Sequence, residues 1–256
     1  MPKARKAKSK RESEPSPGAG NSEIRLADEE AVKEVVWSSI QGLWDVVNSL
    51  TRLRSTRRER YRVSIFGSAR VQPGTFGYEE TKRAAAELAR MGCDIITGGG
   101  PGLMQAANEG AALAPERSRS YGIRVELPFE QNANAFVSHA FEHRTFFTRL
   151  HQFVLASDAF LVTPGGIGTV LETLMIWQLL QVNHLRGTPL VLVGKMWPGL
   201  VEWARDSMLS TEPPLANAKD LDIPVCVSSA DEAIAIVREH RKGWMAEQKR
   251  AVKRKS

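Results

Sequence analysis

The chain has 256 residues, of which 42% are hydrophobic and 25% are charged, enough to bury the core of one large domain or two small ones. No apolar run reaches the roughly 18 residues that a membrane helix needs, and residues 1–22 contain no apolar stretch typical of a signal peptide. The only two cysteines, Cys93 and Cys226, lie far apart, which disfavours a disulfide scaffold and a structural zinc site. We therefore expect a soluble, cytoplasmic protein that does not contact a membrane.

The net charge of +6 comes from the two ends of the chain. Residues 1–22 carry six basic and two acidic side chains, and residues 238–256 carry eight basic and two acidic ones, so residues 23–237 have a net charge of −4. This composition predicts a disordered basic tail at 1–22 and a solvated basic tail at 241–256. Because of their positive charge, we expect such tails to bind RNA or DNA weakly and in a salt-sensitive way.

An amphipathic helix is predicted within an N-terminal extension, residues 23–61. Asp28 is a suitable N-cap, and Glu29 and Glu30 would follow it in the first turn. Apolar residues recur at spacings of three and four: Val32, Val36, Ile40, Leu43, Val47 and Leu50. This helix is expected to pack on its own domain, to form a subunit contact, or to cover a neighbouring site.

From residue 62 to residue 240, short apolar runs alternate with helical patterns. The expected strands are Val63–Phe66, Asp94–Thr97, Tyr121–Leu127, Ala159–Thr163, Pro189–Val193 and Pro224–Val227. The expected helices are Glu79–Met91, Leu103–Leu113, Thr145–Ser157, Thr169–Val182 and Ala230–Glu239. This alternation predicts a single α/β domain, a doubly wound parallel sheet whose strand-to-helix loops meet at one edge.

Three of these loops are rich in glycine or small residues: 67–69, 98–102 and 164–169. Glycine allows a ligand to approach backbone N–H groups, and a helix N-terminus adds unpaired donors and partial positive charge. Two such loops at one edge suit a phosphate-bearing ligand. The sequence contains neither the dinucleotide fingerprint G-x-G-x-x-G with its distant acid nor the P-loop motif, so both of those classes are disfavoured.

Glu172 and Arg149 are the ionisable residues expected near that ligand. Glu172 follows Thr169 by three residues, so it is either a capping-box partner of Thr169 or a carboxylate that stabilises positive charge on a sugar ring. Arg149 lies in an apolar stretch, and it is either a solvated ion-pair partner or a phosphate ligand.

The remaining histidines, cysteines and tryptophans suggest no cofactor. His139 and His143 would share one face if they lay on a helix, but no third metal ligand is apparent, so no metal is predicted. Cys93 is expected to be a small core residue. Trp177, Trp197 and Trp203 are expected in the core or an interface.

The stretch Gly98-Gly99-Gly100-Pro101-Gly102-Leu103-Met104, followed by Pro164-Gly165-Gly166-Ile167-Gly168-Thr169-Val170-Leu171-Glu172, resembles the LOG (Lonely Guy) family. These proteins are nucleoside 5′-monophosphate phosphoribohydrolases that have often been labelled lysine decarboxylases. The motif P-G-G-x-G-T-x-x-E is complete, and the stretches around Leu127–Gln131 and Phe146–Arg149 are similar to bacterial members. The resemblance covers residues 62–240.

The resemblance implies a modified Rossmann-like fold that assembles as a homodimer or a larger homo-oligomer, with active sites near the subunit interface. It implies hydrolysis of the N-glycosidic bond of a cytokinin riboside monophosphate or an AMP-like nucleotide, without a metal or cofactor. Its catalytic pair would be Arg149 and Glu172. The expected substrate-binding residues are Ser68, Gly99, Gly100, Gly102, Glu130, Gly165, Gly166, Gly168 and Thr169.

Two departures from the family pattern leave other functions open. Leu150 stands where a lysine usually follows the arginine, and Leu171 stands where many members have an acidic residue. The main alternative is therefore a non-catalytic carrier or sensor of a nucleotide or of molybdenum cofactor on the same fold. A nucleic-acid-associated factor that acts through its basic tails is a third hypothesis. An amino-acid decarboxylase is disfavoured, because no lysine is placed convincingly for a Schiff base.

Overall fold

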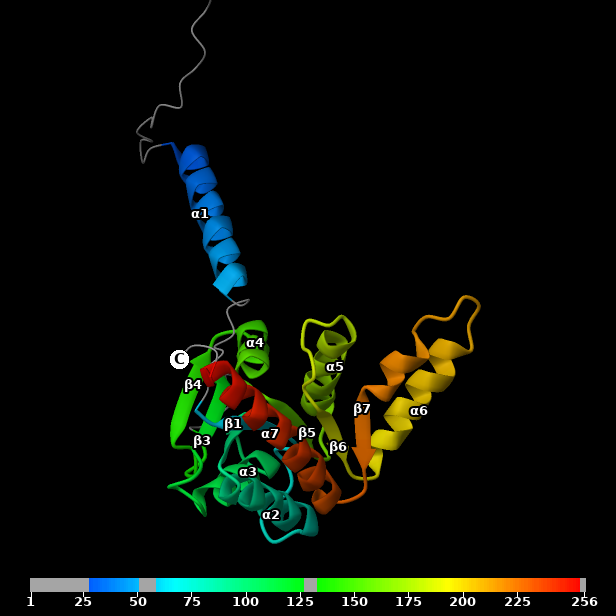
Figure 1. The fold of residues 1–256 in the computed structure, drawn as a ribbon. Coiled ribbons are helices and arrows are strands. Elements are labelled where there is room, and N and C mark those ends of the chain that lie inside the picture. Colours follow the sequence, from blue (N-terminus) through cyan, green and yellow to red (C-terminus); the bar gives the residue numbers. More distant parts are fainter. Residues whose placement is uncertain (1–27, 51–58, 127–132, 254–256) are drawn as a thin grey trace, which may run out of the picture. The chain divides into compact units, whose positions relative to one another are not determined.

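A computed structural model describes residues 28–50, 59–126 and 133–253 of the chain (Figure 1). The chain divides into two compact units, residues 1–53 and 54–256, which we describe separately. None of the helices within the described ranges is long and apolar enough to cross a membrane.

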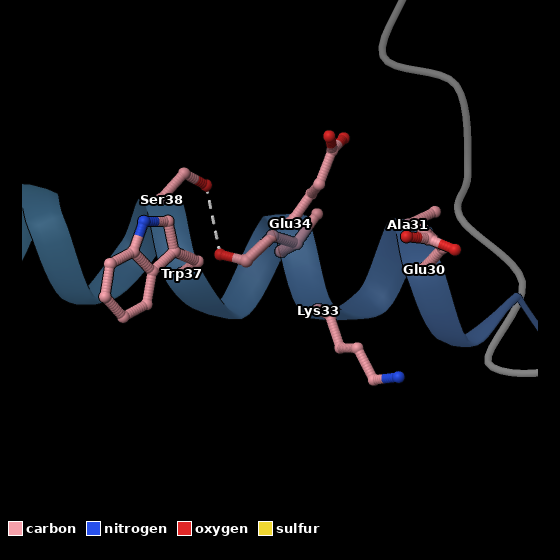
Figure 2. Close-up of a pocket in the computed structure, with 7 residues that line it drawn as sticks. Glu30, Ala31, Lys33, Glu34, Trp37 and Ser38 are labelled. Carbon is pink, nitrogen blue, oxygen red and sulfur yellow. Dashed lines mark hydrogen bonds between the residues drawn. The ribbon is translucent and has the colours of Figure 1, made fainter.

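The first unit contains the predicted amphipathic helix, α1 (Glu29–Leu50). Asp28 caps it as expected, because the Ala31 backbone N–H donates to the Asp28 carboxylate over 3.1 Å. Val36, Ile40 and Leu43 on this helix are all more than half exposed within their unit. Figure 2 shows a hollow along α1 in which Trp37 and Ser38 lie, with the Ser38 hydroxyl donating to the Val35 carbonyl over 3.1 Å. Because the described residues that line this hollow all come from one helix, we assign no site to it.

The second unit is built on a parallel sheet of seven strands, which confirms the predicted doubly wound α/β fold. The order across the sheet is β4-β3-β2-β1-β5-β6-β7, and each neighbouring pair is parallel. The strands are β1 (Tyr61–Phe66), β2 (Cys93–Thr97), β3 (Ser120–Val125), β4 (His139–His143), β5 (Ala159–Val162), β6 (Leu190–Val193) and β7 (Pro224–Val227).

Helices cover both faces of the sheet, and each face has its own apolar core. The helices are α2 (Phe76–Arg90), α3 (Leu103–Ala112), α4 (Phe146–Ala156), α5 (Ile167–Gln181), α6 (Met196–Leu209) and α7 (Ala230–Lys253), with a short 3₁₀ helix η1 (Ala218–Asp222). One core joins α2, α3 and α7 to the sheet through residues such as Leu88, Ala107 and Val237. The other joins α4, α5 and α6 through Phe153, Ile176 and Trp197. Figure 1 shows α2 and α3 side by side.

Two elements, β4 and α6, were not predicted from the sequence. Strand β4 was not predicted, because HAFEH is an exposed edge strand with no continuous apolar run. It places His139 and His143 on a strand, so the helical face considered for them is wrong. Helix α6 was also missed, since Pro198 and Gly199 in its first turn resemble a turn signal.

The helix predicted as Ala230–Glu239 is too short, because α7 continues to Lys253 through most of the predicted basic tail. Most of the described residues from 241 to 250 are exposed, as a solvated segment would be. The aromatic ring of Trp244 on this extension packs edge-on against Tyr61, with ring centroids 5.5 Å apart. This contact gives the extension an apolar anchor on the domain. The tail at 1–22 and the nucleic-acid contact predicted for it lie outside the described residues.

The strand order places a topological switch point between β1 and β5. The chain moves outward from β1 through β2, β3 and β4, and then returns to β5 beside β1. Phe66 at the end of β1 lies opposite Val162 at the end of β5, so the loops that follow these strands leave the sheet together. In open α/β sheets, ligands bind in the crevice outside such a point.

The close packing of α2 on α3 depends on Gly110. A Cβ atom at this position would lie 2.2 Å from the Lys82 carbonyl oxygen and 2.9 Å from the Ala85 Cβ. We expect Gly110→Ala to lower the free energy of unfolding by about 1 to 3 kcal/mol, because the two helices must move apart. Urea unfolding followed by circular dichroism would measure this change.

Gly77→Ala is the matched control, since Gly77 lies in the first turn of α2 and its Cβ would meet nothing within 4 Å. It should leave stability unchanged or raise it by up to about 1 kcal/mol. Equal stability of the two variants would show that the helices do not pack as closely as described.

Candidate active site

A cleft of about 500 Å³ lies at the switch point. Its polar wall comes from the loop after β1 and from helices α4 and α5: Ser68, Arg70, Arg149, Gly166, Gly168, Thr169 and Glu172. Its apolar wall is formed by Met104, Val125, Phe146 and Ile167. The cleft therefore combines charged groups with an apolar surface, as small-molecule sites commonly do.

Backbone hydrogen bonds connect the three glycine-containing loops at this edge. The Ser68 N–H donates to the Pro164 carbonyl over 3.0 Å, and the Leu103 N–H donates to the Ser68 carbonyl over 2.8 Å. Gly102 has a φ of +69°, and a Cβ there would lie 2.3 Å from the Ser68 carbonyl oxygen. Only glycine can occupy this position without strain, so the contact between the loops depends on it.

Arg149 is held in place from several directions. Helix α4 begins after Thr145, whose side chain accepts a hydrogen bond from the Thr148 N–H. The Arg149 Nε donates to the Ile123 carbonyl over 2.9 Å, and the guanidinium lies 5.4 Å from the centre of the Phe153 ring. A Cβ at Gly98 would lie 2.5 Å from the Arg149 Nη2, so the absence of a side chain there makes room for the guanidinium.

Glu172 forms an ion pair with this arginine. The Glu172 Oε1 lies 3.2 Å from the Arg149 Nη1, and the two side chains are only 10% and 13% exposed. Burial raises the pKa of the Glu172 carboxyl to about 7, and the positive charge of Arg149 opposes part of that rise. Glu172 can therefore exchange a proton near neutral pH, which suits a general acid or base.

The capping-box alternative for Glu172 is wrong. Helix α5 begins at Ile167 with Gly166 as its N-cap, so Thr169 already lies inside the first turn and Glu172 lies in the second. The buried Thr169 side chain instead contacts Gly165, where a Cβ would lie 2.2 Å from its hydroxyl oxygen. The first N–H groups of α5 have no partner within the helix, and the residues that carry them, Ile167, Gly168 and Thr169, line the cleft.

The cleft gathers only part of the expected substrate-binding set. Ser68, Gly166, Gly168 and Thr169 line it together with the Arg149–Glu172 pair. The described residues that form its walls do not include the other four expected glycines, Gly99, Gly100, Gly102 and Gly165. Glu130 lies outside the described residues.

A buried polar network holds the Gly98–Gly102 loop. The Gly99 N–H donates to the Thr97 hydroxyl over 2.9 Å, and that hydroxyl donates to the Asn108 side-chain oxygen over 2.6 Å. The Asn134 side-chain amide donates to the carbonyls of Gly99 and Gly100 over 3.1 and 2.9 Å. The network therefore fixes the loop that leads into Met104, a residue of the apolar wall.

Sequence analysis missed Arg70, Val125, Phe146 and Ile167 as parts of the site. Val125 and Phe146 end a strand and begin a helix at the same sheet edge, which is the one signal that could have identified them. Arg70 follows Ser68 by two residues in the β1 loop, and it was not considered.

Outside the cleft, the structure confirms the core positions expected for Cys93 and for two of the three tryptophans. Cys93 is fully buried, and burial raises the pKa of its thiol to about 12, as expected for a core residue. Trp177 and Trp197 are buried in one of the two cores, whereas Trp203 is 59% exposed. Within the described ranges, no three histidine, cysteine or carboxylate side chains gather as a metal site would require.

Comparisons with solved structures agree with the fold. The molybdenum cofactor binding protein from Rippkaea orientalis superposes with a TM-score of 0.54 at 19% identity, covering 72% of this chain and 98% of that one. The Moco carrier protein from Chlamydomonas reinhardtii gives a TM-score of 0.53 at 18% identity, covering 72% and 99%. At these identities the similarity shows the shared fold.

Comparisons of sequence identify the family. The pyrimidine/purine nucleotide 5′-monophosphate nucleosidase of Escherichia coli K12 is 28% identical over 125 residues, which are 46% of this chain and 28% of that protein. The chain thus matches little more than a quarter of the length of that curated relative. The model of the family described as "Possible lysine decarboxylase" matches residues 104–237, more than half of the chain and including both Arg149 and Glu172. The chain belongs to this family, which is the LOG family that its two glycine motifs resemble.

Proposed function

We propose that the protein hydrolyses the N-glycosidic bond of a nucleoside 5′-monophosphate, releasing free base and ribose 5-phosphate. The observation that supports this most directly is the buried Arg149–Glu172 ion pair in a cleft beside the open N-terminus of α5. The E. coli relative, named as a nucleotide 5′-monophosphate nucleosidase, supports the same substrate class.

Glu172 is suited to the bond-breaking step. When the bond between the base and C1′ breaks, positive charge develops on the ribose ring, and a nearby carboxylate stabilises it. The same carboxylate accepts a proton from the water whose oxygen bonds to C1′. Glu172 then passes this proton to the departing base and returns to its ionised form. A pKa near 7 makes Glu172 able to take up a proton and release it again at neutral pH.

Arg149 positions the reacting groups. Its Nη1 holds the Glu172 carboxylate while its Nε is fixed to the Ile123 carbonyl, so the guanidinium has one defined orientation. Its remaining N–H groups are available to oxygen atoms of the ribose. The apolar wall of Met104, Val125 and Phe146 then faces the base. Purine, pyrimidine and cytokinin bases all have apolar ring faces that fit such a wall.

A carrier function is the alternative that the experiment must separate from catalysis. The structural similarity to molybdenum cofactor carriers and the buried, uncharged Leu150 next to Arg149 both favour testing it. Catalysis and carriage differ in one respect: only catalysis releases a free base.

We expect the full chain to release base from at least one of AMP, GMP, CMP, UMP and isopentenyl-AMP, as measured by chromatography. Glu172→Gln should lower this rate by about 10²- to 10⁴-fold while the nucleotide still binds, because it removes the proton acceptor and the negative charge. Asp222→Asn is the control, since Asp222 is an exposed carboxylate paired with Arg205 outside the cleft. Nucleotide binding without release of any base would favour the carrier function.

The pH dependence of hydrolysis should report the ionisation of Glu172. Because the carboxylate form is the active one and its pKa is raised to about 7, kcat/KM should rise with pH through 7 and then level off. Below that point we expect roughly a tenfold loss per pH unit. Initial rates between pH 5.5 and 8.5 would measure this. A profile that stays flat between pH 6 and 8, or that falls as pH rises, would contradict the role of the ionised Glu172 carboxylate in hydrolysis.

We also propose that the protein is a homodimer or larger homo-oligomer through α5 and α6. These helices border a groove of about 380 Å³ lined by apolar side chains, among them Leu174, Trp203 and Leu215. All three are at least 43% exposed, which is unusual for large apolar residues gathered in one place. A second copy that covers this groove would lie next to α5 and therefore close to the cleft.

Trp203→Glu should shift the protein to a smaller molecular mass in size-exclusion chromatography with light scattering, because a charge cannot be buried in an apolar interface without a partner. Phe76→Glu is the control, since Phe76 is 83% exposed on α2, away from this groove. An unchanged mass in Trp203→Glu, or the same shift in both variants, would exclude α5 and α6 as the interface.

A further inference from the structure

Arg70 lines the cleft on the side of strand β1. Its loop is fixed to the loop before α5 by the hydrogen bond from the Ser68 N–H to the Pro164 carbonyl. Within the loop, the Arg70 N–H donates to the Ser68 hydroxyl over 3.1 Å, and the Gln72 side chain donates to the Arg70 carbonyl over 3.2 Å. The backbone of Arg70 is therefore held firmly, next to the first turn of α5.

The side chain of Arg70, in contrast, has no ion-pair partner among the described residues. Other arginines of the domain form such pairs: Arg83 with Glu80 and Asp231, and Arg205 with Asp222. The Arg70 side chain is instead exposed at the cleft. An arginine on a fixed backbone with a free guanidinium is suited to bind a ligand.

The charges in the cleft favour an anion. Its described ionisable residues are Arg70, Arg149 and Glu172, and Glu172 is already paired with Arg149. One positive charge therefore remains unbalanced, and it belongs to Arg70. A planar guanidinium can bind phosphate oxygens through two parallel hydrogen bonds.

The neighbouring backbone leaves room for such a group. Cβ atoms at Gly166 and Gly168 would meet nothing within 4 Å, so the start of α5 faces open space. Arg70 and the residues Gly166 and Gly168 at the start of α5 thus line the same cleft. The Arg149–Glu172 pair and the apolar wall remain for the sugar and the base.

We infer that Arg70 is a substrate-binding residue that binds the 5′-phosphate opposite the N-terminus of α5 and makes the protein prefer nucleoside monophosphates over nucleosides. This inference rests on the proposed function, since it concerns the same cleft. The inference adds a phosphate-binding residue that lies outside both glycine motifs.

The test compares the wild type with Arg70→Gln and Arg70→Lys in the full chain. We expect Arg70→Gln to lower kcat/KM for AMP roughly 10- to 100-fold, as expected for the loss of a charge-assisted hydrogen bond. The rate with adenosine, which lacks the phosphate, should not change. Arg70→Lys should recover part of the loss, since it keeps the charge but not the planar fork. Arg117→Gln is the matched control, because Arg117 is exposed before β3 at the opposite edge of the sheet.

Calorimetric titration with ribose 5-phosphate separates this inference from the proposed function. If no base is released from any nucleotide but Arg70→Gln weakens ribose 5-phosphate binding at least tenfold, the phosphate role of Arg70 stands and the hydrolase proposal fails. If hydrolysis occurs but Arg70→Gln leaves kcat/KM for AMP unchanged, or lowers AMP and adenosine equally, the phosphate role of Arg70 is overturned.

Discussion

The burial of the Glu172 carboxyl next to a single cation is the constraint on which the rest of the site depends. Removing a carboxylate from water is costly, and one arginine at 3.2 Å compensates for only part of that cost, which is why the pKa of Glu172 stays near 7. A pair of this kind contributes little to stability. The fold nevertheless maintains it by fixing Arg149 through the Ile123 carbonyl and by leaving Gly98 without a side chain. Because burying this carboxylate costs free energy, its position at a switch point is best explained by a chemical role.

The glycine motifs serve this pair in two different ways. Gly166 and Gly168 border the cleft and leave open space at the N-terminus of α5. Gly98 and Gly102 instead allow close packing, the first against Arg149 and the second against the backbone of the β1 loop. The polar network through Thr97, Asn108 and Asn134 then keeps the Gly98–Gly102 loop in this position. One motif thus forms the surface that a ligand meets, and the other determines the shape of that surface.

Much of the fold could be predicted from the sequence, because the buried parallel strands are continuous apolar runs and the helices between them are amphipathic. Strand β4 could not, since it is an exposed edge strand, and the full length of α7 could not, since its basic composition conceals the contact of Trp244 with Tyr61. For the site, topology was sufficient to bring Arg149 and Glu172 to one edge of the sheet. It could not show which loop glycines face a ligand, because that depends on close tertiary contacts, of Gly99 with Arg124 and of Gly102 with the backbone of the β1 loop. Arg70 was missed for a related reason: an isolated arginine in a loop has no periodic pattern.

The separation of Arg70 from Arg149 has a chemical advantage for the proposed reaction. A phosphate dianion bound directly to Arg149 would compete with Glu172 for the same guanidinium, and its negative charge would raise the pKa of Glu172 further. Glu172 would then stay protonated at neutral pH and could not accept a proton from water. Binding of the phosphate by Arg70 and the N-terminus of α5 avoids this competition, so Arg149 can continue to hold Glu172 in its ionised form. With Leu150 buried and uncharged beside Arg149, the loop after β1 supplies the second cation at the described walls of the cleft. In this proposed arrangement, Arg70 from the β1 loop binds the phosphate, and Arg149 from helix α4 holds the Glu172 carboxylate.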